Sequence, residues 1–520
     1  MKFNRLPNRR ALVSLGLAMA LFVPLSACSS GDGEDTGSTS NIEYFSAAAA
    51  DVAKLDPALG STSGMVGTGA LWIGVFDTLV NIAPDGAVEP RLASKVEGSD
   101  DFVTWTVTLR SGLTFSDGTP FDAEAVVQHW TRLADPKTGS KDQGQAGALK
   151  SITAVDAATI EVTLDEPDAH WPDVLASTAL ALVPSPTAVE KYGDKFGTSP
   201  ETTVGAGPFT VTAWRRDDRV TLARSKTYWN SKEVGPKQVV FRYVTDPSLR
   251  AKTFSAGEGD IMALTAPGDE LVEARKNYTE FDASLIGALA VAVNTREGHP
   301  TSSTELRQAL AAAVDIDAAL KRSAPGAEAI TSLYPKSSPY NEEADGLFGD
   351  PAKAQDLVDQ YLAGTGKSSV SIVFVTNQQY SGVAQALKQD WDKIKGLDVK
   401  IEVEQSLLDR LGSRDFDLIF SAFGGGTPRA LVDRLRSTEK ATNVTGISDP
   451  ALDDALLRYS RSLDPEAMGE ALSDVQASVW EKVPYMPALA QIGSNFARNK
   501  DMDVPILTDS AVDFSGIEVK

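Results

Sequence analysis

Apolar and polar side chains recur along this chain with spacings that predict particular elements. Over residues 103–109, Val, Trp, Val and Leu alternate with Thr, which predicts a strand with one buried face. The pair Asp117-Gly118 marks a turn after it. Asp122 stands where a helix cap is favoured, and Glu124 falls in the first turn, where a negative charge suits the helix dipole. The pattern predicts a strand, a turn and a capped helix in succession.

Two later segments have the form of a strand, a loop and a helix. The apolar runs SIVFVT at 371–376 and FDLIF at 416–420 predict strands. Asn377-Gln378-Gln379-Tyr380 follows the first run at a helix start. Three glycines follow the second, and a helix-like segment then opens at Arg429.

Other segments complete the outline. Residues 306–320 predict two short helices, with Asp315 and Asp317 as caps of the second. Gly205 to Pro208 predicts a turn at the start of a strand. Trp72 lies inside an apolar run and is expected in the core. We find no internal repeat and no heptad run.

The first 28 residues have the pattern of an export signal. Four basic residues among the first ten precede an apolar run at 11–27, which is short and contains a proline, so it suits a signal peptide better than a spanning helix. The run ends in Leu-Ser-Ala-Cys, which resembles a bacterial lipobox, whose cysteine is acylated. An ordinary cleaved signal is the alternative. Because Cys28 is the only cysteine in the chain, we expect it to be the lipidation site.

Residues 28–40 are expected to form a flexible tether. From Ser29 to Ser40 the chain is polar, rich in Gly and Ser, and unable to bury a core of its own. No later stretch reaches 18 consecutive apolar residues. The sequence therefore predicts a globular protein anchored by lipid to the extracytoplasmic face of the cell membrane.

Length and charge narrow the class of protein. The chain has 520 residues, enough for two or three domains, and 42% of them are hydrophobic. Its formal net charge is −22, which argues against binding the phosphate backbone of nucleic acids. With one cysteine, the chain offers no pair of thiols for a disulfide.

The residues for catalysis, metal binding or nucleotide binding are poorly placed. The three histidines, His129, His170 and His299, form no metal-spacing pair and follow no nucleophile elbow. We expect His129 to pack beside Trp130, and His299 to be solvated. The glycines at 424–426 lack the Gly-Lys-Ser/Thr ending of a phosphate-binding loop. We therefore expect no enzyme activity, no catalytic residue, no metal and no cofactor.

Several motifs occur together in a characteristic order. They are LDPAL from 55, DGAVEPRLA at 85–93, TWTVTLRSGLTFSDGTPFDAEAVV at 104–127, GAGPF from 205, DPAKAQDLV from 350, DFDLIFSAF from 415, ISDPALDDAL from 447 and WEKVPYMPAL from 480. Together they resemble the bacterial extracellular solute-binding proteins of family 5, the peptide/nickel class of binding lipoproteins of ABC importers. The resemblance covers essentially the whole chain after the tether, and it makes Gly257 to Asp260 a helix-to-strand turn.

The resemblance implies an α/β, two-lobed periplasmic-binding-protein-like fold of type II, in the large peptide-binding class with an extra subdomain. The boundaries that it implies are 41–70, 205–290 and 488–520 for lobe 1, 71–204 for its subdomain and 291–487 for lobe 2.

The resemblance also implies where a solute would bind. In peptide-binding relatives an aromatic residue packs on the ligand and an acidic residue pairs with its α-ammonium; Phe423 falls at the first position here, and Gly426 at the second. An ammonium buried without a carboxylate is costly. An anionic or neutral ligand, or a peptide held by Glu402 or Glu404, is therefore favoured. The candidate ligand-binding residues are Ser61, Thr62, Ser63, Met65, Asn377, Gln378, Tyr380, Glu404, Phe423, Gly424, Gly425, Gly426 and Arg429.

Two of these assignments have structural alternatives. Arg429 could face solvent on its helix, and the segment from Asn377 could be an ordinary loop with a capping Asn.

The favoured hypothesis is a monomeric, lipid-anchored receptor that captures an oligopeptide or peptide-like solute between its lobes and delivers it to ABC permease subunits and their ATPases. The ligand could instead be an oligosaccharide, an opine-like acid or a metal chelate. The rival classes are a sensor lipoprotein and an exported hydrolase.

Overall fold

A computed structural model describes most of the chain after the predicted tether. The described residues are 41–46, 52–59, 68–83, 87–264, 268–281, 289–327, 329, 332–334, 340–341, 346–422, 427–439, 442–486, 494–507 and 511–519. The predicted signal peptide, Cys28 and the tether lie outside them.

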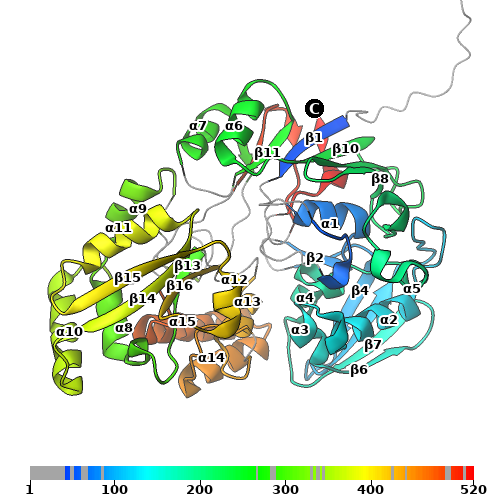
Figure 1. Cartoon of the computed structure of the whole chain (residues 1–520). Helices are drawn as coiled ribbons and strands as arrows, with labels where there is room; N and C mark the ends of the chain where they lie inside the picture. The colour runs from blue at the N-terminus through cyan, green and yellow to red at the C-terminus, as the bar shows by residue number, and fades with distance from the viewer. Residues whose placement is uncertain are drawn as a thin grey trace, which may run out of the picture. The chain divides into compact units, whose positions relative to one another are not determined.

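A seven-stranded mixed sheet collects segments from distant parts of the sequence (Figure 1). Its strands, in spatial order, are β12 (Thr279–Phe281), β18 (Ser494–Ala497), β11 (Ile261–Leu264), β1 (Asn41–Ser46), β10 (Gln238–Tyr243), β9 (Arg219–Arg224) and β8 (Phe209–Arg215). The first strand in the sequence, β1, is central and runs parallel to both neighbours. Its Ile42, Tyr44 and Phe45 are buried, as expected for a strand covered on both faces.

A four-stranded antiparallel sheet follows in the sequence. It has the order β4 (Ala93–Gly98), β5 (Thr104–Leu109), β7 (Thr159–Leu164) and β6 (Leu149–Ala154). In β5, Trp105, Val107 and Leu109 are buried while the threonines between them are not, so the predicted alternating strand is confirmed.

Helices pack against these two sheets. They are α1 (Gly69–Phe76), α2 (Ala123–Ala134), α3 (Gln143–Gly147), α4 (Trp171–Ser177), α5 (Pro186–Tyr192), α6 (Pro247–Ser255) and α7 (Asp269–Asn277), with a small pair of strands, β2 (Val80–Ile82) and β3 (Val88–Pro90), beside them. The Asp122 carboxylate accepts a hydrogen bond from the Ala125 N–H at 3.0 Å, which confirms the predicted cap of α2. Trp72 in α1 is 3% exposed and belongs to the core, as predicted. One apolar cluster runs through both sheets, joining Tyr44 to Trp130.

A five-stranded sheet forms the other α/β part of the described chain. It has the order β15 (Leu397–Glu404), β14 (Val370–Asn377), β16 (Leu418–Ala422), β13 (Leu289–Val293) and β17 (Tyr485–Met486). Its helices are α8 (Thr304–Ala312), α9 (Ile316–Ser323), α10 (Pro351–Thr365), α11 (Ser381–Trp391), α12 (Leu408–Ser413), α13 (Arg429–Leu435), α14 (Pro450–Ser460) and α15 (Pro465–Lys482). The strands predicted at 371–376 and 416–420 correspond to β14 and β16.

Apolar layers cover both faces of this sheet. Val291 and Val293 of β13 pack in the cluster that includes α8, α9 and α11, while Ala290 and Ala292 pack in the cluster that includes α13, α14 and α15. Such two-sided burial explains why β13 and β16 in the middle of the sheet are mostly apolar, whereas the edge strand β15 alternates apolar and charged residues.

Several predicted turns and caps are confirmed. Asp315 accepts from the Ala318 N–H at 2.9 Å and caps α9, while Asp317 lies in the first turn and is not the cap. Gly257 to Asp260 joins α6 to β11, with positive φ angles at both glycines, and Gly205 to Pro208 precedes β8. Among the helices of the described part of the chain, none combines the length and apolarity needed to cross a bilayer. The predicted segmentation into two lobes and a subdomain stays a prediction.

Candidate functional site

The strand register brings several predicted site residues to one edge of the five-stranded sheet. β14 runs parallel to both β15 and β16, so their carboxyl ends, at Asn377, Glu404 and Ala422, face the same way. Leu289, where β13 begins, pairs with Ala422 at this edge. Ligands of α/β sheets commonly bind beyond the carboxyl ends of the strands. The predicted residues at 423–426 follow Ala422 directly, but they and residues 61–65 lie outside the described part of the chain.

The segment after β14 has local structural contacts. Asn377 Oδ1 accepts a hydrogen bond from the Tyr380 N–H at 3.1 Å, so Asn377 stabilises the turn before α11. The Tyr380 ring packs on Phe420 with 5.5 Å between centroids, and burial raises the pKa of its phenol. Gln378 is exposed. The capping alternative for Asn377 therefore agrees with its contacts, and solute binding by these residues stays a prediction.

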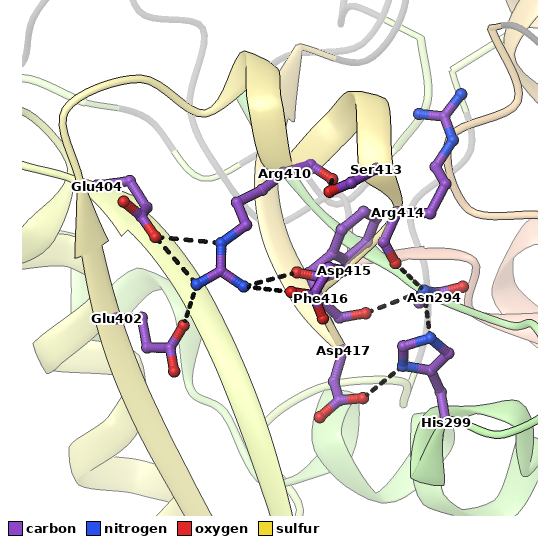
Figure 2. Close-up of polar contacts among 10 residues, drawn as sticks. All are labelled: Asn294, His299, Glu402, Glu404, Arg410, Ser413, Arg414, Asp415, Phe416 and Asp417. Atoms are coloured by element: carbon purple, nitrogen blue, oxygen red, sulfur yellow. Dashed lines mark hydrogen bonds and ion pairs between the residues drawn. The ribbon is translucent and has the colours of Figure 1, made fainter.

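Glu404 already has a cationic partner. Arg410 Nη2 lies 2.6 Å from Glu402 Oε2 and 3.0 Å from Glu404 Oε1, and its Nη1 lies 2.8 Å from Asp415 Oδ2 (Figure 2). These carboxylates are partly exposed, so the ion pairs contribute little to stability. A peptide ammonium would nevertheless have to compete with Arg410 for Glu402 and Glu404. The sequence did not predict this pair, because Glu404 ends β15 and Arg410 lies in α12, a separate element.

Arg429 is mostly shielded from solvent and paired, so the alternative in which it faces solvent is wrong. Its side chain is 15% exposed, with Nε 2.6 Å from Asp168 Oδ2 and Nη1 2.6 Å from Asp433 Oδ1. Burial alone would lower the pKa of Arg429, but attraction to the two carboxylates raises it. Because two carboxylates compensate this one guanidinium, little positive charge is left to attract an anionic solute. Solute binding by Arg429 stays a prediction, now without that electrostatic support.

A cavity of about 230 Å³ lies beside Arg429. One wall comes from the chain around β6, β7 and α4, and the other from α13 and the residues after it. The lining residues are Gln145, Ala148, Leu149, Leu164, Asp165, Glu166, Pro167, Asp168, Trp171, Val174, Arg429, Val432, Arg436, Thr438, Glu439 and Ser460. Sequence reasoning missed the first wall, because about 260 residues separate Asp168 from Arg429 and no local pattern links them.

Asp142 is a buried carboxylate close enough to Asp433 to feel its charge. Its Oδ2 accepts from the Ala179 N–H at 2.7 Å. Burial raises the pKa of Asp142 to about 6; the Ala179 hydrogen bond opposes the shift and the charge of Asp433 adds to it. The native state therefore binds this proton more tightly than the unfolded chain does, and the stability from Asp142 is lost as the pH rises from about 4 through about 6.

Replacing Asp142 by Asn should consequently stabilise the protein at alkaline pH. An amide oxygen keeps an acceptor for Ala179 without a charge to bury. We expect Asp142→Asn to gain about 2–3 kcal/mol over the wild type at pH 8 and about half of that at pH 5, measured by chemical denaturation at both values. Asp156→Asn is the control, because Asp156 is exposed and hydrogen bonds lower its pKa. Equal effects of Asp142→Asn at the two pH values would contradict the assignment.

The histidines have structural partners. His129 is buried, as predicted, with Nε2 2.9 Å from the Ala179 carbonyl oxygen, and burial lowers its pKa to about 4. His299 is solvated only in part: its side chain is 27% exposed, and its Nδ1 lies 2.9 Å from Asp417 Oδ1 and its Nε2 3.1 Å from the Asn294 amide (Figure 2). Nowhere in the described ranges do three or more His, Cys, Asp or Glu side chains converge to hold a metal ion.

Comparison with known proteins identifies the class of this chain. Residues 87–442 match the family described as "Bacterial extracellular solute-binding proteins, family 5 Middle". The chain is 28% identical over 417 residues to the glutathione-binding protein GsiB of Shigella flexneri, covering 77% of this chain and 80% of that protein.

Solved structures show the same fold. The murein tripeptide binding protein MppA of Escherichia coli superposes with a TM-score of 0.76 at 22% identity, covering 92% of this chain and 98% of MppA. AgaA in complex with agropinic acid, from A.tumefacien R10, gives a TM-score of 0.77 at 21% identity, covering 92% and 99%. These likenesses confirm the predicted two-lobed periplasmic-binding-protein fold. With more than half of its length matched by the family, the chain belongs to family 5 of the bacterial extracellular solute-binding proteins.

Proposed function

We propose that this protein is the lipid-anchored, extracytoplasmic receptor of an ABC importer. The observation that carries the proposal is the family match over residues 87–442, which includes every residue lining the cavity beside Arg429 except Ser460. The apolar run at 11–27, Cys28 and the polar tether support anchoring at the outer face of the membrane. The receptor closes around one solute because the closed form binds it better, and presents that form to the permease.

The solute that we propose is a small peptide-like acid. Relatives at 26–28% identity are glutathione-binding proteins, which favours a peptide-like ligand. Gly426 stands where peptide-binding relatives place the acid that pairs with a free α-ammonium. Glutathione carries a carboxylate on the same carbon as its ammonium, so that charge needs less compensation from the protein than the isolated ammonium of a simple dipeptide. The proposed solute therefore brings its own counter-charge.

An opine-like acid is the second candidate. AgaA, which shares the fold, is in complex with agropinic acid. Gly426 supplies no carboxylate to pair with a ligand ammonium, and this absence suits opine-like acids equally well.

A thermal-shift panel tests both candidates. The purified protein is heated with glutathione, alanyl-alanine, agropinic acid or maltotriose. We expect glutathione or agropinic acid to raise the melting temperature most, since a ligand at 100 times its dissociation constant adds about 2.7 kcal/mol to stability. A largest shift with alanyl-alanine would show that the protein supplies an ammonium partner despite Gly426. A shift with maltotriose alone would overturn the peptide-like assignment.

A further inference from the structure

Two arginines, Arg429 in α13 and Arg436 directly after it, contact carboxylates that lie far away in the sequence. Arg429 contacts Asp168, and Arg436 forms an ion pair with Glu166, whose side chain is half-exposed. Both carboxylates belong to the segment 165–170 between β7 and α4, on the side of the four-stranded sheet. Both arginines belong to the side of the five-stranded sheet. The contacts therefore join the two α/β parts without any covalent link at this place.

The same segment also makes backbone and ring contacts with α14 and the residues that follow it. The Ala169 N–H donates to the Ser460 carbonyl oxygen at 2.7 Å, and His170 Nε2 lies 3.1 Å from the Ser462 carbonyl oxygen. The His170 ring stacks on Tyr459, with 4.2 Å between centroids and 4° between planes. We call the contacts of 165–170 with α13, α14 and Ser462 the junction. The hydrogen bonds and the ring stack give the junction a defined geometry, in addition to the electrostatic attraction of its ion pairs.

The arrangement around Arg429 makes the junction reversible. Asp433 is four residues along the same helix and lies 2.6 Å from Arg429, on the same side of the junction. If the two sides separate, Arg429 keeps Asp433, while Asp168 loses its cationic partner and the Arg436–Glu166 pair opens. Removing every partner from a buried charge is costly, but Arg429 retains the Asp433 carboxylate in either state. Two carboxylates on one arginine thus allow an ionic contact to open and close.

We propose that Asp168 and Arg429 form a latch that holds the two α/β parts together and sets the solute's apparent affinity through the fraction of the protein that is closed. The proposal rests on the receptor function above, because it concerns closure around a solute. If only the closed form binds tightly, the apparent dissociation constant rises in proportion as the closed fraction falls. Arg429 is on this account a positioning residue for closure.

Two variants each remove one carboxylate partner of Arg429. Comparing them distinguishes a latch that controls closure from an ion-pair cluster that only stabilises the fold. Asp168→Asn weakens the contact across the junction and leaves the Arg429–Asp433 pair. Asp433→Asn leaves the contact across the junction intact. For distance measurements, Lys150→Cys in β6 and Lys367→Cys after α10, both exposed, carry a donor and an acceptor dye, and Cys28→Ser removes the native thiol.

Without solute, we expect Asp168→Asn to lower the energy transfer between the dyes, and Asp433→Asn to leave it unchanged. Raising the salt from about 50 mM to about 500 mM should lower the transfer in the wild type more than in Asp168→Asn, because an ionic contact across separating surfaces is screened. With glutathione as the probe, Asp168→Asn should raise the dissociation constant roughly tenfold and Asp433→Asn less than twofold.

The outcomes separate the latch from the receptor function. Equal energy transfer in the two variants and the wild type, or an equal loss in both variants, overturns the latch. Binding of glutathione with the same affinity in both variants also overturns the latch and leaves the receptor function standing. A loss of transfer in Asp168→Asn alone, in a protein that binds no solute of the panel, supports the latch and contradicts the proposed solute.

Discussion

Replacement of Arg91 by methionine should lower the free energy of unfolding by about 3–5 kcal/mol, because it leaves two buried carboxylates without their cation. Arg91 Nε lies 2.5 Å from Asp77 Oδ1, and its Nη1 lies 2.8 Å from Asp513 Oδ2. The Asp77 side chain is fully buried, and that of Asp513 is 9% exposed. The Tyr228 hydroxyl donates to Asp77 Oδ2 at 2.9 Å, so four distant segments meet in this network.

The loss should grow with pH. Burial raises the pKa of Asp77 even in the presence of Arg91, and burial would raise that of Asp513 if Arg91 did not outweigh it. Without Arg91 both carboxyls bind protons more tightly in the native state, so the variant loses stability as the pH rises. Chemical denaturation of both proteins at pH 5 and pH 8 measures the difference.

Arg458→Met is the matched control for Arg91→Met. Arg458 also contacts two carboxylates, Asp454 at 3.0 Å and Asp474 at 2.7 Å, but its side chain is 43% exposed. Exposed ion pairs contribute about 0–1 kcal/mol, so this variant should unfold almost as the wild type does. Similar losses in Arg458→Met and Arg91→Met would show that burial does not decide the energy of these contacts.

Local patterns in the sequence predicted the elements whose causes are local. The alternation over 103–109 needs only the pleat of a strand, and the cap at Asp122 needs only the next three residues, so both predictions are confirmed. The family was also recognisable, because its motifs mark turns and close contacts. Arg91 lies in DGAVEPRLA, and Gly205 opens GAGPF.

Side-chain partners across long separations could not be read in the same way. His299 looked like a solvated loop residue, but its partner Asp417 lies 118 positions away. Arg429 looked like a free cation because Asp168 is 261 positions away and comes near only in the folded chain. The Asp433 partner, by contrast, was available from the sequence, because residues four apart on a helix face each other. The Asp433 carboxylate partly neutralises Arg429, so the sequence already contained an argument against using Arg429 to bind an anionic ligand.

Replacement of Gly205 by alanine should lower the free energy of unfolding by about 3 kcal/mol or more, because the added methyl group meets backbone that cannot move independently. A Cβ atom at Gly205 would lie 2.2 Å from the Val75 carbonyl oxygen and 2.7 Å from a carbon of the Phe76 ring. Val75 and Phe76 form the end of α1 and are buried in the core. The Gly207 N–H donates to the same Val75 oxygen at 2.9 Å, so the end of α1 is fixed against this turn.

The control for Gly205→Ala is Gly144→Ala in α3. A Cβ atom at Gly144 would meet no atom within 4 Å, and alanine favours helix over glycine by about 0.5–1 kcal/mol, so this variant should be neutral or slightly more stable. Chemical denaturation of both variants separates the steric effect from the general effect of replacing glycine. A Gly205→Ala protein as stable as the wild type would mean that the end of α1 can shift by about an ångström at little cost. Because the contact is with the Val75 backbone oxygen, a smaller side chain at residue 75 should not restore the lost stability.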